Sequence, residues 1–546
     1  MSENGKQAAA GNLILVLVAM VLGVLIGVMT ASHQNHKGVA NEGTQGKINE
    51  VLRLLENEYV DELDSDTISD RLLQAILHEL DPHSTYLPPR DMEHTDEMMR
   101  GAFEGVGLVL RYSGDTTYVN QVLKDGPSFG IGILPGDMIF CVDGDTVSGV
   151  GMSTDSVVSR LRGPRGSRVK VEVRRRVDGK EQPFSWTIKR GVVPHHTISC
   201  STMLDDTTGY IVLTSFASTS YSEFREALTD LKRRGMRCLV FDLRGNGGGS
   251  LQDAVGIASE MLPAGSLVVY TEGAHSRRRN QFVHRDGMFT KGRVVVLVDE
   301  HSASASEVVC GALQDNDRAV IAGRRTFGKG LVQVEEHLSD GSAVLLTTAR
   351  YYTPSGRCIQ RSYANGTEEY YREYFDQLIN ESYADSMTMA ILDSTPYYTS
   401  KGRVVYGGGG ITPDVPLTYL KHRSYIYYNA LANKGIIRNV AFDYLRSHSV
   451  ELTDRYRDAE SFKRGFTVDE ALVSEVVRRG EAAGIAYDSE SLKIHRALIV
   501  SMIKANIGSS LFGDQAFYDS YLQHDDDLQR VLNSLTPGPS PGRRGE

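Results

Sequence analysis

Strand-like and helical segments alternate along the middle of the chain, and this alternation limits the fold more than any other feature of the sequence. Apolar runs typical of buried strands occur at 209–215, 238–243 and 294–298. Helical patterns follow at 223–233, from about Gln252 and from about Ser304. Repeated strand–turn–helix units predict an α/β domain, whose active site lies at the carboxyl ends of the strands.

The other parts of the chain have different patterns, because 546 residues exceed one ordinary core. Amphipathic helices are predicted around Ile48–Tyr59 and Ile68–Leu80, the second ending before Pro82. Residues 103–190 contain short alternating runs separated by turns, which predict a small, mostly β domain. After about residue 420 the sequence is helical and charged.

An apolar segment near the N-terminus predicts a membrane anchor. Leu13–Met29 contains no charged or polar side chain, and a spanning helix needs about 20 apolar residues. A cleaved signal peptide is the alternative, but Thr30-Ala31-Ser32 makes a poor cleavage site. We expect a single-pass anchor in the bacterial inner membrane, with Lys6 in the cytoplasm and the bulk of the chain in the periplasm.

Composition excludes several classes of function. The net charge of −10 argues against a nucleic-acid partner. The five cysteines are widely spaced and form no CxxC motif, which excludes a zinc site or a disulfide framework that could be recognised from sequence. No metal or other cofactor is therefore expected.

The segment Asp299–Glu307 follows the apolar run 294–298 and contains three serines among small residues. A serine at such a strand-to-helix turn lies near free N–H groups that favour developing negative charge. The alternative is that these serines only cap the helix.

Two glycine-rich segments complete the set. Lys329 lies between two glycines, and burial there would lower its pKa and free the amine to act as a base. Asp242–Gly249 ends an apolar run in a triple-glycine turn, which can present N–H groups to an oxyanion. It could also bind phosphate, but the GK[ST] end of a P-loop is missing.

These three segments resemble the C-terminal processing peptidases, also called tail-specific proteases. The serine turn matches the family motif S-A-S-A-S-E, and the family lysine follows the nucleophile by 25 residues. The resemblance implies that Ser304 is the nucleophile and Lys329 its base, with Gln333 orienting the lysine. It also implies that the backbone N–H groups of Gly248 and Ala305 bind the oxyanion.

Further matches extend the resemblance over about residues 48–416. They include the entry motif at 80–87 and a segment similar to the carboxylate-binding loop of a PDZ domain. The resemblance implies that this domain binds substrate tails through Glu104, Gly105, Val106, Gly107 and Leu108, with Arg162 as a sensor of the bound tail.

The resemblance implies an α/β protease core of crotonase- or ClpP-like β/α repeats, with an inserted small, mostly β PDZ domain. Helices at the N-terminus and a helical C-terminal extension complete the expected fold. The predicted divisions are a cytoplasmic N-terminus (1–11), a transmembrane anchor (12–30), a tether (31–47), an N-terminal helical region (48–100), the PDZ domain (101–190), the protease core (191–420, with an insertion at about 361–409), the extension (421–535) and a disordered tail (536–546).

The expected activity is that of a serine endopeptidase acting on proteins or peptides with free C-termini. The C-terminal extension could mediate homo-oligomerisation, cover the core or bind an adaptor. One alternative is a non-catalytic PDZ scaffold with an inactive protease core. Another is a hydrolase with a histidine base, but the GxSxG string at 126–130 contains Ser128 of the β domain and lacks the strand–turn–helix context.

Overall fold

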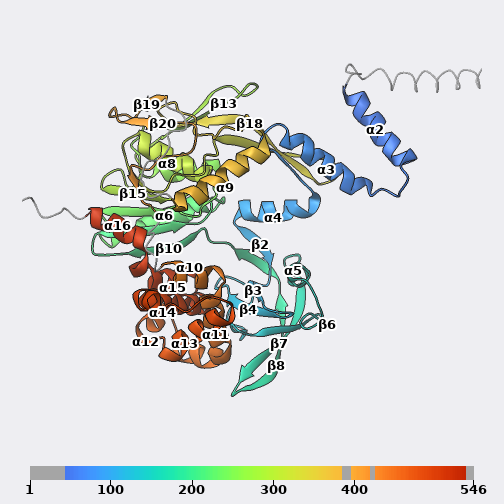
Figure 1. The fold of residues 1–546 in the computed structure, drawn as a ribbon, viewed down its shortest axis with the longest axis vertical. Helices are drawn as coiled ribbons and strands as arrows, with labels where there is room; N and C mark the ends of the chain where they lie inside the picture. Colours follow the sequence, from blue (N-terminus) through green and yellow to red (C-terminus); the bar gives the residue numbers. More distant parts are fainter. Residues whose placement is uncertain (1–43, 384–394, 419–424, 536–546) are drawn as a thin grey trace, which may run out of the picture. The chain divides into compact units, whose positions relative to one another are not determined.

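The computed structural model describes residues 44–383, 395–418 and 425–535 (Figure 1). The predicted anchor at 12–30 and the predicted tail at 536–546 lie outside these residues. Among the described residues, no helix is both long and apolar enough to cross a membrane. The chain divides between Ile76 and Leu77 into two compact units. The first contains α2 (Thr44–Glu58) and most of α3 (Ser65–His78).

A six-stranded sheet forms the centre of the second unit (Figure 1). Its order is β10 (Ile198–Met203), β11 (Thr208–Leu213), β12 (Cys238–Asp242), β15 (Arg293–Val298), β16 (Val320–Gly323) and β21 (Val415–Pro416). All neighbours are parallel except β10 and β11. Helices α6 (Ser220–Arg233), α7 (Leu251–Ser259) and α8 (Ala305–Asp315) follow strands of this sheet, as the alternating pattern predicted.

Both faces of the central sheet are buried, because side chains alternate between them along each strand. Phe241 and Val296 point into the cluster that contains the apolar residues of α6, α7 and α8. Val240 and Val295 point to the other face, where they cluster with residues from the end of the chain. The middle residues of β11, β12 and β15 are apolar, as expected for a parallel sheet covered on both sides.

A second sheet carries part of the N-terminal region. Its path is β1 (Thr85–Leu87), β18 (Ala343–Tyr352), β13 (Leu267–Glu272) and β14 (Arg279–Phe282), and β17 (Leu331–His337) also pairs with β18. The region 48–100, predicted to be helical, therefore also contains a strand, since β1 joins this sheet before α4 (Pro89–Arg100) begins. A three-residue strand is too short to show a period in sequence.

The small β domain lies between α4 and the central sheet along the chain. Its sheet contains β3 (Leu108–Tyr112), β4 (Thr117–Val122), β5 (Met138–Val142), β6 (Asp145–Thr146), β7 (Arg168–Val177) and β8 (Lys180–Lys189), with α5 (Thr154–Leu161). The ribbon of β2 (Ala102–Gly105) and β9 (Gly191–Pro194) connects it to the rest of the unit.

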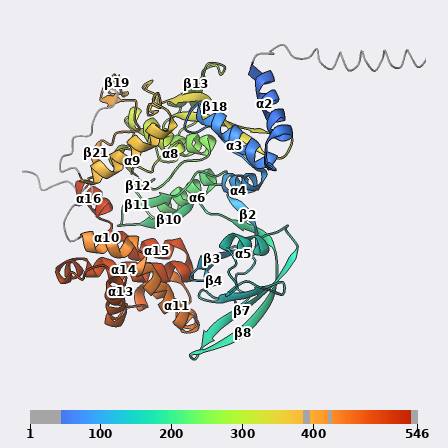
Figure 2. The ribbon, with the colours of Figure 1, turned by 45° about the vertical axis from the view of Figure 1, so that its right-hand side comes forward.

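The end of the chain is helical (Figure 2). It contains α10 (Tyr425–Asn433), α11 (Ile436–Arg455), α12 (Ala459–Gly465), α13 (Glu470–Ala482), α14 (Ser489–Phe512), α15 (Asp514–Tyr521), the 3-10 turn η1 (Leu522–His524) and α16 (Asp526–Leu535). Leu522, Leu528 and Val531 complete the second face of the central sheet. Of the three roles considered for the extension, covering the core is therefore what this structure shows.

The extension also contacts the β domain. Arg446 donates a hydrogen bond to the hydroxyl of Tyr118 (2.8 Å), and the ring of Tyr118 lies 5.7 Å from that of Phe442. A Cβ added at Gly136, whose φ is 94°, would lie 2.8 Å from the Cα of Arg446. The backbones therefore approach so closely that only glycine fits at this position.

The insertion 361–409 begins with α9 (Thr367–Tyr383) and ends in the hairpin of β19 (Pro396–Tyr398) and β20 (Val404–Tyr406). Residues 384–394 between them lie outside the described part of the chain. Helix α9 carries several tyrosines that reach the segment around Lys329, as described below.

Candidate active site

Ser304 lies in the turn between β15 and α8, where its φ of 55° falls in the left-handed region. This conformation is costly for any residue with a side chain, and such strain clusters at functional sites. The serine is partly buried, and its backbone N–H donates to the carboxylate of Glu307 (2.9 Å). The turn is thus fixed by the helix that follows it.

Glu307 joins this turn to the lysine loop, residues 325–330. Its carboxylate also accepts hydrogen bonds from the hydroxyl of Thr326 (2.6 Å) and from the N–H groups of Gly328 and Lys329 (both 2.8 Å). The side chain is fully buried. Burial raises the pKa of Glu307 to about 7, and the four hydrogen bonds oppose that rise. The Glu307 carboxylate therefore holds the backbone of both the serine turn and the lysine loop.

Tyr351 of β18 makes a second connection. Its hydroxyl lies 3.1 Å from the carbonyl oxygen of Ser304 and 2.7 Å from that of Lys329. The sequence analysis identified neither Glu307 nor Tyr351 as a site residue. The signal for Glu307 was its place three residues after Ser304, which is the acidic position of a capping box.

Lys329 is held by a side-chain relay. Its Nζ donates to Oε1 of Gln333 (2.7 Å), and Nε2 of Gln333 donates to the carbonyl oxygen of His83. Burial lowers the pKa of Lys329, while the carboxylates of Asp81 and Glu307 oppose that change. No hydrogen bond links the described side chains of Ser304 and Lys329. Such contacts often tighten only when substrate binds.

The glycine turn lies directly against the serine. A Cβ added at Gly248 would come within 2.8 Å of the Cβ of Ser304 and 3.0 Å of the nitrogen of Ala305. The two predicted oxyanion donors are therefore neighbours. The N–H of Gly248 donates to Oδ1 of Asn246 (2.9 Å), whereas among the described residues the N–H of Ala305 has no recorded acceptor. The N–H of Gly248 thus already has an acceptor in this structure.

Aromatic side chains of α9 cover the lysine loop. The hydroxyl of Tyr370 lies 3.1 Å from Nε2 of His83, and the ring of Tyr374 lies 4.8 Å from that of Phe327. Burial lowers the pKa of His83 to about 4, and the nearby Lys329 contributes to that change. His83 is therefore neutral near pH 7. His83 belongs to the entry motif at 80–87, but its contact with Tyr370 was not predicted because it spans 287 positions.

The predicted tail-binding loop opens the β domain. Glu104 and Gly105 end β2, Val106 and Gly107 form the connection, and Leu108 begins β3. A Cβ added at Gly107 would lie 2.7 Å from the Cα of Gly126, so the loop packs closely on a neighbouring turn. The carboxylate of Glu104 accepts from the N–H of Arg165 (2.8 Å).

The guanidinium of Arg162 is already paired with another side chain in this structure. Its guanidinium donates to the buried carboxylate of Glu97 in α4 (2.5 Å) and lies over the ring of Phe103. The predicted tail sensor is thus tied to the helix that precedes the β domain.

The histidine-base alternative finds no support in the geometry. Ser128 is fully buried, and its hydroxyl donates to the carbonyl oxygen of Val106 (2.6 Å). A nucleophile must be reached by substrate, so this serine is structural.

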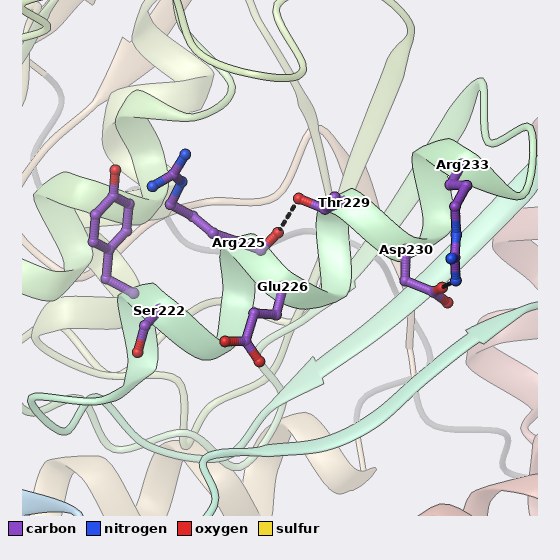
Figure 3. Close-up of a pocket in the computed structure, with 7 residues that line it drawn as sticks. Ser222, Arg225, Glu226, Thr229, Asp230 and Arg233 are labelled. Carbon is purple, nitrogen blue, oxygen red and sulfur yellow. Dashed lines mark hydrogen bonds and ion pairs between the residues drawn. The ribbon is translucent and has the colours of Figure 1, made fainter.

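A separate pocket lies along α6, with a volume of about 510 Å³ (Figure 3). It is lined by Tyr221, Ser222, Arg225, Glu226, Thr229, Asp230 and Arg233. Its lining contains none of the predicted site residues. Asp230 pairs with Arg233 and Arg225 with Glu260, so its charges are mostly satisfied locally.

A serine at a strand-to-helix turn, a partly buried lysine and a separate small β domain fit a serine peptidase with an attached PDZ domain. The model of peptidase family S41 matches residues 207–369, and that of the PDZ domain matches residues 118–175. A family of unknown function matches residues 427–513, within the helical extension.

Known proteins define the family. The carboxy-terminal processing protease CtpA of Bacillus subtilis is 31% identical over 316 residues, or 58% of this chain and 66% of its own length. The carboxy-terminal-processing protease of Bartonella bacilliformis is 30% identical over 353 residues, or 63% of this chain and 78% of its own length. The chain belongs to the carboxy-terminal processing proteases of peptidase family S41.

A solved photosystem II D1 C-terminal processing protease is 28% identical, with a TM-score of 0.36 over 69% of this chain and 88% of its own. The comparison of the core with the crotonase and ClpP folds stays a prediction.

Proposed function

We propose that this chain is an endopeptidase that uses Ser304 as nucleophile and Lys329 as general base, and that selects proteins by their C-terminal tails. One observation carries the proposal: the Glu307 carboxylate binds the backbone of both Ser304 and Lys329. A buried acceptor shared in this way fixes two residues that are otherwise 25 positions apart. The lowered pKa of Lys329 supports the assignment of the base.

The chemistry follows from these roles. Neutral Lys329 takes the proton of Ser304 as Oγ attacks the scissile carbonyl, and returns it to the leaving amine as the C–N bond breaks. Water, deprotonated by the same lysine, then releases the acyl group from Ser304. The N–H groups of Ala305 and Gly248 stabilise the oxyanion, and each such donor contributes about 10²–10³ in rate.

The PDZ domain supplies the selection. A substrate tail would add to the edge of the domain as an extended strand, and its carboxylate would bind the N–H groups of the Glu104–Leu108 loop. The pairing of Arg162 with Glu97 gives this domain a direct contact with α4.

The test is cleavage of an unstructured protein with an apolar C-terminal tail by the full chain. Wild type is expected to cleave it, Ser304→Ala to be inactive, and a substrate whose tail ends in an amide to be cleaved more slowly. Tail binding without cleavage by wild type would instead favour a PDZ scaffold. Equal cleavage of the free and amidated tails would contradict selection by the PDZ domain.

The pH dependence tests the base separately. Activity is expected to rise with pH as Lys329 loses its proton, with an apparent pKa below the ordinary 10.5. Gln333→Glu would place a carboxylate on Nζ, favour the ammonium and move this rise to higher pH by about one to three units. Gln281→Glu adds the same charge on the exposed strand β14 and should leave the profile unchanged. A profile of Gln333→Glu that matches wild type would contradict the assignment.

The membrane location is part of the proposal. Residues 12–30 would anchor the chain in the inner membrane with the protease in the periplasm. The chain is then expected to remain in membranes washed with carbonate and to be digested by protease added to spheroplasts. Recovery in the soluble periplasmic fraction would favour the cleaved signal peptide.

A further inference from the structure

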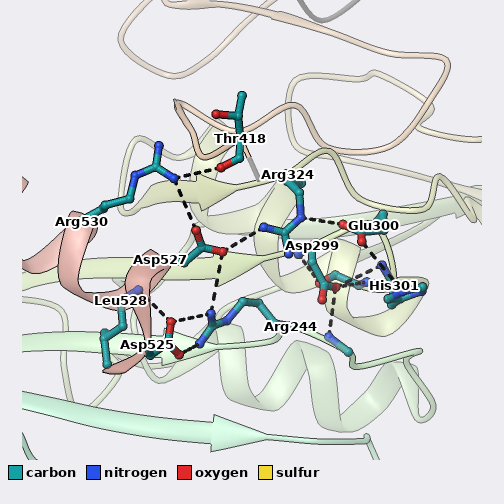
Figure 4. Close-up of polar contacts among 12 residues, drawn as sticks. Arg244, Asp299, Glu300, His301, Arg324, Thr418, Asp525, Asp527, Leu528 and Arg530 are labelled. Carbon is teal, nitrogen blue, oxygen red and sulfur yellow. Dashed lines mark hydrogen bonds and ion pairs between the residues drawn. The ribbon is translucent and has the colours of Figure 1, made fainter. Parts of the chain in front are cut away.

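Two carboxylates of the C-terminal extension bind arginines that lie next to the glycine turn and the lysine loop. Leu522, Leu528 and Val531 fix its last segment on the central sheet. Between them, Asp525 and Asp527 lie at the start of α16. Figure 4 shows both carboxylates directed at arginines that follow strands of the sheet.

Asp525 holds the start of the glycine turn. It is 2% exposed, and its carboxylate accepts two hydrogen bonds from Arg244 (2.6 and 3.1 Å). Arg244 lies two residues after the end of β12 and is also bound by Asp242. Two residues further on, Asn246 controls the N–H of Gly248. A shift of Arg244 would therefore displace Asn246, two residues further along the backbone, and with it the N–H of Gly248, the predicted oxyanion donor.

Asp527 holds the start of the lysine loop. Its carboxylate accepts from Arg324 (2.8 Å), which directly follows β16 and precedes the loop. Arg324 also donates to Glu300 (2.7 Å), which lies in the turn before Ser304. Arg324, which is bound by the extension, thus connects the start of the lysine loop to the turn that precedes Ser304.

We propose that Asp525 and Asp527 are positioning residues of the protease, which set the glycine turn and the lysine loop through Arg244 and Arg324. The extension would then contribute to the geometry of the active site without contacting the substrate. This inference rests on the proposed function for its kinetic readout. It follows from the contacts of these four side chains. Asp525 and Asp527 lie outside residues 48–416, which carry the resemblance to the family.

The test compares Asp525→Asn, Asp527→Asn and the double variant with wild type as full-length chains. Asparagine can keep the helix cap that Asp525 provides to the N–H of Leu528 (3.0 Å), while it removes the charge and replaces one acceptor oxygen of Arg244 with an NH2 donor. The double variant is expected to lose kcat by about 10–100-fold, as small misplacements of catalytic groups do, with KM changed less than about threefold. The control is Glu475→Gln, which breaks exposed ion pairs with Arg478 and Arg479 in the same extension.

Hydrogen exchange provides a readout that does not depend on activity. Residues 245–249 and 325–330 are expected to exchange faster in the double variant and unchanged in Glu475→Gln, while the strands of the PDZ domain keep their protection. Unchanged kcat and unchanged loop exchange would overturn the inference. So would a general loss of protection, which would mean that the carboxylates only stabilise the fold. A wild type that cleaves nothing would refute the proposed function, yet loop exchange would still decide this inference.

Discussion

Replacing Lys329 with methionine is expected to lower kcat/KM by about four orders of magnitude or more, because the nucleophile then has no base. Methionine keeps the length and apolar stem of the side chain, so the loop should keep its place between its glycines. Lys329→Arg should be equally inactive, since a guanidinium stays charged and cannot accept the proton of Ser304. Cleavage of a tailed, unstructured substrate measures all three proteins.

The control for this prediction is Lys232→Met, which removes an exposed lysine whose Nζ donates to the carbonyl oxygen of Met288 (2.5 Å). It should retain wild-type activity. If Lys329→Arg proved active, the lysine would act as a cation and not as a base. If Lys329→Met were active and His83→Ala were not, the base would be the imidazole that lies near the lysine.

Replacing Glu307 with alanine is expected to abolish activity and to lower the free energy of unfolding by about 3–5 kcal/mol. The change leaves the N–H groups of Ser304, Gly328 and Lys329 without their acceptor in a buried site. An unsatisfied buried donor costs about 1–3 kcal/mol. Denaturant unfolding followed by fluorescence measures the loss.

Two variants make this prediction specific. Glu226→Ala removes an exposed glutamate from α6 and should change stability by less than about 0.5 kcal/mol. Glu307→Gln should not restore the activity or stability that Glu307→Ala loses. Its amide NH2 would face two backbone N–H groups, which need an acceptor. Wild-type stability in Glu307→Ala would show that the loops are held by other contacts.

The pH dependence of stability has a definite sign at Glu307. Burial raises its pKa from 4.5 to about 7, so the folded state holds this proton more tightly than the unfolded state does. The contribution of the carboxyl group to stability is therefore full below pH 4.5 and declines as the pH rises to about 7. Glu307→Ala should lack this part of the pH dependence.

The sequence predicted the central α/β layer well, because the middle residues of β11, β12 and β15 form apolar runs. It did not predict which segment covers the second face. Leu522, Leu528 and Val531 belong to ordinary amphipathic stretches, and nothing local shows that they pack against Val240 and Val295. Strand β1 was missed because three residues carry no period.

The candidate site was predicted in part for a similar reason. Ser304, Lys329 and Gln333 lie in short motifs whose spacing is visible in one dimension. The contacts of Glu307 with the lysine loop, and of Tyr370 with His83, join residues that are 19 or more positions apart. The turn at Gly248 also has a positive φ of 103°, which the glycine permits but does not reveal.

The late position of α16 has a consequence for how the protein is made. The last strand of the central sheet ends at Pro416, and the first residue of the extension that packs on its second face is Tyr518, 518 − 416 = 102 positions later. A ribosome adds about 5–20 residues per second, so for several seconds the sheet is complete but half bare. During that interval neither Asp525 nor Asp527 exists to hold Arg244 or Arg324. On the proposed role of these two carboxylates, the protease of a nascent chain would be about 10–100-fold slower until this segment is made.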